Sequence, residues 1–273
     1  MPIPTTLEIR TTTRVNPVGF CIYCGSKEDL AGEHIVPFGL GGNAILPEAS
    51  CPRCSAITSA FEGKVLGGFM LEARTAGKFP TRRPKKRPTT LPLTVERGDG
   101  LESIDLPSSE SPGFLQLPRL EATAFLSGRA PVNGVTICGS EILVFGTAPD
   151  KVASELGTKT IQTTANMDVI AFVRMLAKIG YSFAVAAQGP YPLNEVPVLP
   201  LILGSALDGS TWVGSAEYSL AVEAQSPQHG LCLISAIVTV DGNTEEILIA
   251  RVKLFASAGA TGYEVVVRRR RVP

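Results

Sequence analysis

Two pairs of cysteines near the start of the chain have the residue type and the spacing of a metal site. They are Cys21-x2-Cys24 and Cys51-x2-Cys54. Each pair can place two thiolates on one tight turn, and two such turns supply the four sulfur ligands that tetrahedral Zn²⁺ prefers. The spacing therefore predicts a structural zinc site that closes the loop between the two pairs.

A disulfide framework and unrelated free thiols are the alternatives to zinc at these four cysteines. The chain starts Met1-Pro-Ile-Pro, without a basic region followed by an apolar run. We therefore expect no signal peptide and a reducing, cytoplasmic location, where zinc is favoured over disulfides. Cys138 and Cys232 lie in apolar, strand-like runs, which predicts that both are buried core residues.

The loop between the cysteine pairs contains the run Glu33-His-Ile-Val-Pro37, with one of the two histidines of the chain, and then Leu40-Gly-Gly-Asn43. With the paired cysteines, this stretch resembles the HNH endonucleases, also called His-Me finger or ββα-metal nucleases. In that family an acidic residue and a histidine end the first strand, a Gly-rich turn leads to the second strand, and the second cysteine pair opens the helix. The resemblance covers roughly residues 20 to 70.

The resemblance implies a metal-dependent endonuclease that hydrolyses phosphodiester bonds in DNA. His34 would be the general base that activates water, since imidazole titrates near neutral pH. Glu33 would be a ligand of a catalytic Mg²⁺ or Mn²⁺, for which carboxylate oxygen is suited, separate from the structural Zn²⁺. Asn43 would hold the loop that carries His34 in the correct orientation.

The sequence departs from the family pattern directly after the second cysteine pair. Many members have Asn or His there as a metal ligand, but this chain has Ser55, whose hydroxyl is a poor ligand. If the helix opens at Cys51 or Pro52, Glu62 lies two turns beyond Ser55 on the same face and could replace it. The alternatives are that Glu33 and Glu62 are solvated acids and that Asn43 is only a turn residue.

The 273 residues leave room for a small zinc module and one larger domain. We predict an HNH nuclease domain over 1–77, a basic Pro-rich linker over 78–90, and a C-terminal domain over 91–273 with a recognition or regulatory role. The net charge is zero, yet basic residues are concentrated in the N-terminal third and at the C-terminus. The linker residues expected to contact nucleic-acid phosphates are Arg82, Arg83, Lys85, Lys86 and Arg87.

The C-terminal part predicts an α+β fold with a mainly antiparallel sheet and one long helix. Apolar residues recur every three or four positions over residues 166–188, which predicts a helix that packs on the sheet. Its Arg174 and Lys178 are predicted to be solvated, residues 101–118 to be a loop, and Arg268–Arg271 to be a frayed tail that could also contact nucleic acid. His229 is predicted to be structural. No apolar run reaches the length of a membrane span.

Three classes of function fit these patterns. The first is an HNH endonuclease acting on DNA, with RNA as the other substrate class, and defence against foreign DNA is one role that the resemblance allows. The second is a catalytically decayed zinc module that binds DNA or a protein without cutting. The third is a protein-interaction module held by zinc. A homodimer, or a ligand or partner that activates the C-terminal domain, are further expectations.

Overall fold

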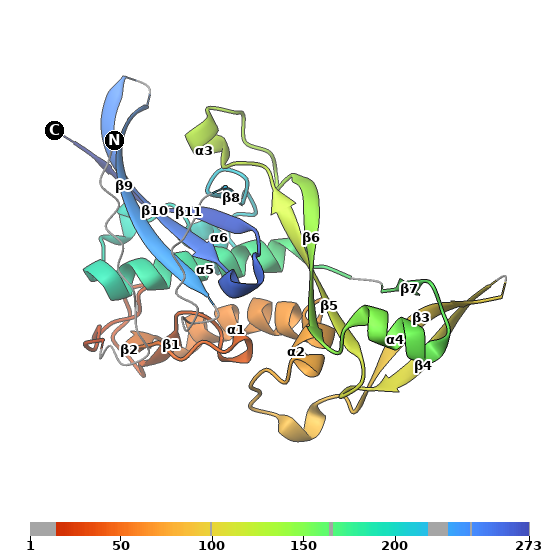
Figure 1. Cartoon of the computed structure of the whole chain (residues 1–273). Coiled ribbons are helices and arrows are strands. Elements are labelled where there is room, and N and C mark those ends of the chain that lie inside the picture. The colour runs from red at the N-terminus through yellow and green to blue at the C-terminus, as the bar shows by residue number, and fades with distance from the viewer. Residues whose placement is uncertain (1–14, 99, 164–165, 218–228, 241, 273) are drawn as a thin grey trace.

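The computed structural model describes residues 15–98, 100–163, 166–217, 229–240 and 242–272. Within these residues the chain is a mixed α+β protein with antiparallel sheets and a few helices, as predicted (Figure 1). All pairs of named strands run antiparallel. The fold has three parts. An N-terminal hairpin is followed by a helix, a four-stranded sheet lies in the C-terminal part, and a projecting lobe lies between them in the sequence.

The N-terminal part is a two-stranded hairpin followed by a helix. Strand β1 (Ala31–His34) pairs with β2 (Ile45–Ser50), and α1 (Pro52–Gly67) begins directly after it. The connection between the strands contains the short 3-10 helix η1 (Phe38–Leu40). A Cβ atom at Gly42 would lie 2.0 Å from the carbonyl oxygen of Val36, so only glycine fits where the loop after His34 turns back.

A four-stranded antiparallel sheet forms the centre of the C-terminal part. Its order is β8-β11-β10-β9, with β8 Val213–Ser215, β9 Gly230–Val240, β10 Asn243–Lys253 and β11 Gly262–Arg271. Strands β9 and β10 form a hairpin, in which Asn243 pairs with Val240. The helices beside this sheet are α5 (Val169–Gln188), α6 (Leu199–Leu203), η3 (Leu193–Glu195) and η4 (Ala256–Ala258).

Helix α5 is the core helix of the molecule. The Asp168 carboxylate caps its first turn by accepting a hydrogen bond from Ala171 N at 2.9 Å, and Gly189 follows its last residue. The helix is long and apolar enough to cross a membrane by length and composition, but 78% of that stretch is buried inside the protein. Its apolar faces therefore pack against α1 on one side and the sheet on the other (Figure 1).

The middle of the chain forms a ribbon and a lobe that projects to the right in Figure 1. The ribbon consists of β5 (Pro112–Leu120) and β6 (Ile137–Gly146). The lobe consists of β3 (Thr90–Arg97), β4 (Gly100–Pro107), β7 (Ile161–Gln162) and α4 (Pro149–Leu156), and has its own small core around Val95 and Val152. The short helices are α2 (Leu71–Ala76), η2 (Pro84–Lys86) and α3 (Ala124–Ser127).

One hydrophobic cluster joins the zinc-module residues to the C-terminal sheet. It runs from Cys21 and Phe61 to Met175 on α5 and Val265 on β11. Phe79, within the predicted linker, is buried in the same cluster and packs edge-on against Phe145 and Phe255. The start of the linker is therefore packed, whereas residues 82–86 are exposed as expected.

Several predicted segments are wrong. Residues 101–118 were expected to form a loop but form β4 and most of β5, because their few apolar side chains pair across neighbouring strands of the lobe and ribbon. Strand β5 ends at Leu120, and the short helix α3 follows it. Thr123 caps α3 by accepting a hydrogen bond from Leu126 N.

The C-terminal arginines are also not a frayed tail. Strand β11 continues to Arg271 and pairs with β10 up to that residue. The arginines at its end bind acidic side chains on neighbouring segments. Arg268 binds Glu195 at 2.7 Å, Arg269 binds Glu245, and Arg270 binds Glu246 at 2.6 Å. Their charge is thus largely neutralised by the protein itself.

The approach of α5 to the sheet depends on Gly180. A Cβ atom there would lie 3.1 Å from the Cβ atoms of Ala250 and Val265. We expect Gly180→Val to lower the free energy of unfolding by roughly 1–3 kcal/mol through overpacking, measured by denaturant unfolding. Gly63→Val on the exposed face of α1 is the matched control, since nothing lies within 4 Å of a Cβ atom there. Equal stability of the two variants would contradict this account of the packing.

Candidate zinc centre and adjoining polar site

The four paired cysteines converge on one point. Their sulfur atoms all lie within 4.8 Å of one another, although the pairs come from different elements. The first pair lies on a turn in which Gly25 N donates to the carbonyl oxygen of Cys21 at 2.8 Å, and Gly25 has a positive φ of 79°. The second pair lies at the start of α1, where Cys51 is the N-cap and Cys54 is in the first turn.

The geometry and the chemistry of this cluster fit zinc. Ligands at about 2.3 Å from a tetrahedral ion lie about 3.8 Å from one another, and the Sγ atoms of Cys24 and Cys51 are 3.7 Å apart. All six cysteines are free, so the disulfide alternative is excluded for this structure. Burial raises the pKa of Cys51, but hydrogen bonds from the Cys54 backbone and from the other three thiols outweigh it and lower the pKa to about 7. The four cysteines could therefore hold a structural metal ion such as zinc.

The two other cysteines lie outside this cluster. Cys232 is buried in β9, as predicted. The prediction for Cys138 is wrong, because its side chain is exposed on β6 and its thiol donates to the carbonyl oxygen of Arg119 at 3.3 Å. Strand β6 belongs to a two-stranded ribbon whose outer face is solvated, and apolar sequence alone does not distinguish this from a core strand.

These positions provide a matched pair of variants for the zinc site. We expect purified wild-type protein to contain one zinc per chain, measured by mass spectrometry of the metal. Cys24→Ser should lose the zinc and lower the melting temperature strongly, because structural zinc contributes directly to folding free energy. Cys138→Ser, also at an exposed cysteine, should retain both. Full zinc content in Cys24→Ser would show that the cluster is not a four-thiolate site.

A buried lysine lies at the centre of the polar site beside the cysteines. The ammonium of Lys178, on α5, is 2.8 Å from Glu33 Oε1 on β1 and 2.9 Å from Glu62 Oε1 on α1. It also donates a hydrogen bond to the backbone carbonyl oxygen of His34. The Lys178 side chain is fully buried, and those of Glu33 and Glu62 are 8% and 18% exposed. The expectation that Lys178 is solvated is wrong.

Electrostatics favours the charged lysine in this position. Burial alone would lower the pKa of Lys178, but the negative charges of Glu33 and Glu62 raise it above the ordinary lysine value. Burial raises the pKa of Glu62, and Lys178 opposes that rise. A buried charge is tolerated only with such partners. The two carboxylates expected to bind a catalytic metal are thus paired with Lys178, and their arrangement does not support a Mg²⁺ or Mn²⁺ site.

His34 lies at the edge of this buried cluster and is half-buried. Burial lowers its pKa below the ordinary value, the positive charges of Arg82 and Lys178 lower it further, and Glu33 opposes them. The ring of Phe38 contacts both the half-buried His34 and the exposed Arg82, edge-on to the His34 ring at 6.0 Å and beneath the Arg82 guanidinium at 5.8 Å. The lowered pKa of His34 favours the neutral imidazole, and an exposed cation lies close to it.

The remaining predicted residues of the motif are placed less directly. Asn43 is exposed just before β2, and its side chain forms no hydrogen bond with other described residues. Its role in holding the loop stays a prediction. Ser55 is in the first turn of α1, where its backbone oxygen accepts a hydrogen bond from Thr58. Glu62 is therefore the residue of α1 that reaches the polar site.

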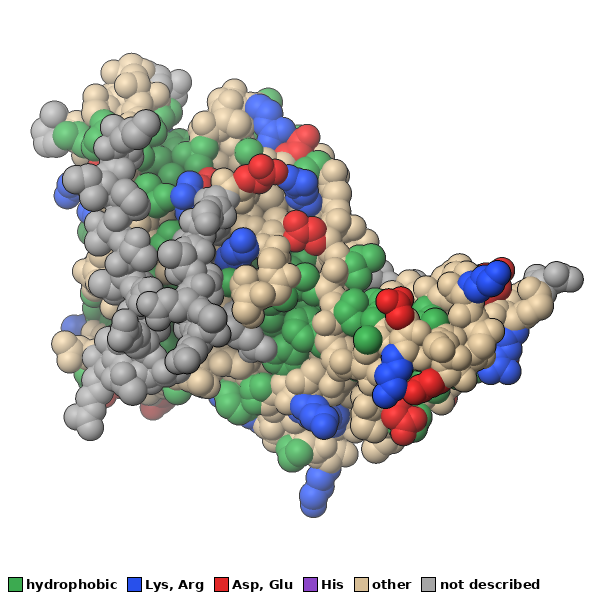
Figure 2. Space-filling model, in the orientation of Figure 1, with side chains coloured by type: hydrophobic (Ala, Val, Ile, Leu, Met, Phe, Trp, Pro, Cys, Tyr) green, Lys and Arg blue, Asp and Glu red, His purple; other side chains and the backbone are tan. Residues whose placement is uncertain are grey.

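The basic segment 82–87 extends from the polar site along the surface. Arg82 is at the site, whereas the others lie on or next to η2, and Arg87 is tied back by donating to the carbonyl oxygen of Phe79. Figure 2 shows positive side chains projecting at the lower edge of the molecule, where Figure 1 places η2. On the projecting lobe, by contrast, charges of both signs are interspersed in the same view. The segment that follows the site is thus the exposed basic stretch closest to it.

The second histidine, His229, connects the loop after His34 to the C-terminal sheet. Its Nε2 is 2.8 Å from the carbonyl oxygen of Leu40, and its Nδ1 accepts a hydrogen bond from Phe255 N at 3.2 Å. Nε2 must therefore carry the proton and donate to Leu40. The prediction of a structural role is confirmed by these contacts.

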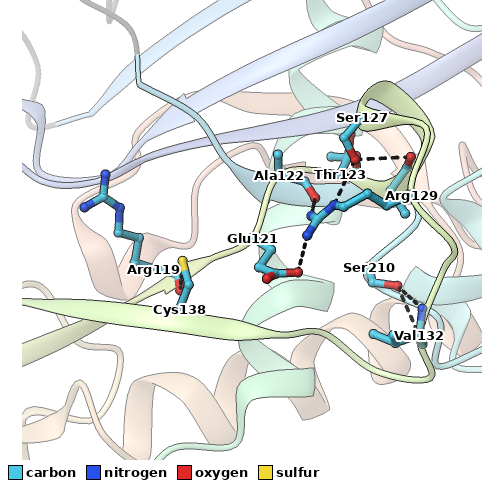
Figure 3. Close-up of polar contacts among 10 residues, drawn as sticks. Arg119, Glu121, Ala122, Thr123, Ser127, Arg129, Val132, Cys138 and Ser210 are labelled. Carbon is cyan, nitrogen blue, oxygen red and sulfur yellow. Dashed lines mark hydrogen bonds and ion pairs between the residues drawn. The ribbon is translucent and has the colours of Figure 1, made fainter.

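Two cavities lie away from the polar site. The first cavity has a volume of about 50 Å³, and Figure 3 shows the polar contacts around it. Arg129 binds Glu121 and the carbonyl oxygen of Ala122. The Ser210 hydroxyl accepts a hydrogen bond from Val132 N and donates one to the carbonyl oxygen of Val132. Its polar groups thus bind one another. The second, of about 360 Å³, lies beside Glu72 and is lined mainly by parts of α2, β5 and β6 and by the segment after β7. An activating ligand stays a prediction.

Comparison with protein-family models, with curated proteins and with solved structures found no match for this chain. The resemblance to HNH endonucleases therefore rests on the motif residues of the sequence and stays a prediction.

Burial of His229 makes stability depend on pH. Burial lowers its folded-state pKa, so below the ordinary value of about 6.5 the unfolded chain takes up a proton before the folded protein does. Stability is then lost as pH falls, by at most about 1.4 kcal/mol per pH unit. We expect this fall between pH 7.5 and 5.5 to be steeper for wild type than for His229→Gln, measured by urea unfolding. Parallel curves would contradict the burial of a neutral imidazole.

Proposed function

We propose that this protein is an HNH-type endonuclease in which His34 is the general base for cleavage of nucleic-acid phosphodiester bonds. The observation that carries the proposal is the grouping of a neutral, half-buried imidazole, an exposed guanidinium and a basic surface segment beside a four-cysteine cluster. Each of these groups has a distinct role in binding or cleaving a phosphodiester.

His34 would accept the proton of the attacking hydroxyl group. In hydrolysis, a water oxygen forms a bond to phosphorus, its proton passes to a ring nitrogen of His34, and the bond from phosphorus to the leaving oxygen breaks. The electron pair of that bond remains on the leaving oxygen, which takes a proton from solvent. Such general-base catalysis contributes about 10²–10⁴-fold to a rate.

Arg82 would bind the phosphate that is attacked. Its guanidinium is exposed and lies over the Phe38 ring that also contacts His34, so both groups can face one phosphate. A guanidinium offers two parallel donors to phosphate oxygens and stays charged. Lys85, Lys86 and the neighbouring arginines would bind adjacent phosphates of DNA or RNA without reading the sequence.

The proposed reaction uses no catalytic Mg²⁺ or Mn²⁺, because Glu33 and Glu62, the carboxylates expected to bind such an ion, are paired with Lys178. The same pairing, together with Ser55 in place of a family ligand, favours a second candidate function. In this alternative the zinc module binds nucleic acid or a protein partner and does not cut.

Cleavage of plasmid DNA and of a folded RNA separates the two candidates. We expect wild-type protein to cut one of these substrates and His34→Ala to cut at least about 100-fold more slowly. The control Cys138→Ser should keep full activity, and all three proteins should carry one zinc. Absence of cutting by zinc-loaded wild type, with or without Mg²⁺ or Mn²⁺, would refute the nuclease and leave the binding module.

Binding has its own matched variants. The double variant Lys85→Ala/Lys86→Ala should weaken DNA binding and lower the slope of log affinity against log salt by up to about 2, since each phosphate contact contributes about 0.9. Lys151→Ala/Lys159→Ala removes the same charge from exposed positions on and after α4 and should leave both unchanged. Fluorescence anisotropy between 50 and 200 mM salt measures both. Equal effects of the two pairs would show that net charge, and not the η2 segment, binds DNA.

A further inference from the structure

We infer that Lys178 is the permanent cation of the Glu33–Glu62 site, and that this site does not take up a divalent metal. The inference rests on the proposed function and deepens it, because it assigns to Lys178 the role of holding Glu33, the residue before His34, in place. It also makes cleavage by this protein, where it occurs, independent of Mg²⁺ and Mn²⁺. It depends on the contacts of Lys178 and can be tested without measuring cleavage.

The ammonium has acceptor groups on three sides. An ammonium group has three N–H donors; Nζ donates a hydrogen bond to the carbonyl oxygen of His34 and lies at ion-pair distance from the carboxylates of Glu33 and Glu62, while Glu62 Oε1 accepts no hydrogen bond from the described residues. A Mg²⁺ ion binds oxygen at about 2.0–2.1 Å. An ion that bridged these two carboxylate oxygens from the side of Nζ would occupy the space of the nitrogen, which lies 2.8 and 2.9 Å from them.

The charges are also balanced without a metal. Two carboxylates carry two negative charges, and Lys178 and the nearby Arg82 carry two positive charges, with Arg82 acting on both Glu62 and His34. A divalent ion would therefore add two positive charges beside a fully buried ammonium. In a buried site such repulsion is weakly screened and strongly unfavourable.

Lys178 cannot withdraw to make room for an ion. Its side chain leaves the middle of α5, which is packed between α1 and the sheet. One turn further on, Tyr181 donates to the carbonyl oxygen of Ile22 at 2.7 Å, and Gly180 holds the helix close to the sheet. Exchange of the ammonium for a metal would therefore require the fully buried Lys178 side chain to find another place within this packed core.

The arrangement gives Lys178 a positioning role at His34. It binds the side chain of Glu33 and the backbone oxygen of His34, and therefore fixes the end of β1 relative to α1 and α5. In HNH-type sites a metal ion is expected to link the acidic residue at the end of the first strand to a ligand on the helix. Here the link is made by a side chain of the C-terminal part of the chain.

The first test measures Mn²⁺ binding by zinc-loaded wild-type protein, through the loss of the electron paramagnetic resonance signal of free Mn²⁺. We expect no binding at one ion per chain up to about millimolar Mn²⁺. Binding of one Mn²⁺ per chain that Glu33→Gln abolishes, with zinc content unchanged, would overturn the inference. This test uses the unmodified protein and so does not depend on the folding of a variant at Lys178.

The second test removes the ammonium. Lys178→Met should lower the melting temperature, because two buried carboxylates lose their partner, and Mn²⁺ should then raise that temperature by roughly 5–10 °C at about 100 times its Kd. The triple variant Glu33→Gln/Glu62→Gln/Lys178→Met has side chains of similar shape without their charges. Mn²⁺ should not change the melting temperature of this variant or of wild type. An equal Mn²⁺ response of wild type and Lys178→Met would overturn the inference.

Cleavage assays then separate this inference from the proposed function. Cutting by zinc-loaded wild type after removal of free divalent ions would support both. Cutting that requires Mn²⁺, together with Mn²⁺ binding dependent on Glu33, would retain the nuclease and overturn the role of Lys178. Absence of cutting, with Mn²⁺ affecting only Lys178→Met, would retain the role of Lys178 and refute the nuclease.

Discussion

The contact on which the rest of the site depends is the buried ammonium of Lys178 between Glu33, Glu62 and the backbone of His34. Three charged side chains from β1, α1 and α5 meet inside the hydrophobic core, where each would be unfavourable alone. Because each charge is stabilised only by the others, the three elements must keep a fixed arrangement. The position of His34 thus follows from a core contact made by a helix that is distant in sequence.

The cysteine cluster, which could hold zinc, and hydrogen bonds fix the loop around His34 at other points. The cysteine cluster holds the turn before β1 to the start of α1. Tyr181 binds the backbone of Ile22 within that turn, and His229 binds Leu40 beyond His34. Every one of these ties except the metal joins the zinc module to the C-terminal part. The module is therefore stabilised by the larger core, and a small metal-closed hairpin does not have to hold the site by itself.

The same arrangement constrains the chemistry at the surface. Because Glu33 and Glu62 are paired inside the protein, the groups of the site that reach the surface are the half-buried His34 and Phe38 and the exposed Arg82, followed by the basic η2 segment. Such a surface presents an imidazole and positive charge, and it suits an anionic polymer better than a free divalent ion. The proposed phosphate chemistry uses these exposed groups and requires no second metal.

Local pattern determined much of this protein. The spacing of the cysteines specified the cluster, the glycines after His34 specified the turn between β1 and β2, and the apolar period specified α5, because each depends on neighbours in sequence. Tertiary structure alone decided that residues 101–118 pair as strands, that Cys138 faces solvent and that the arginines of β11 bind acids. Above all, tertiary structure decided that Lys178 is buried and paired. Its burial depends on two carboxylates more than a hundred residues away in the sequence, which helical periodicity cannot reveal.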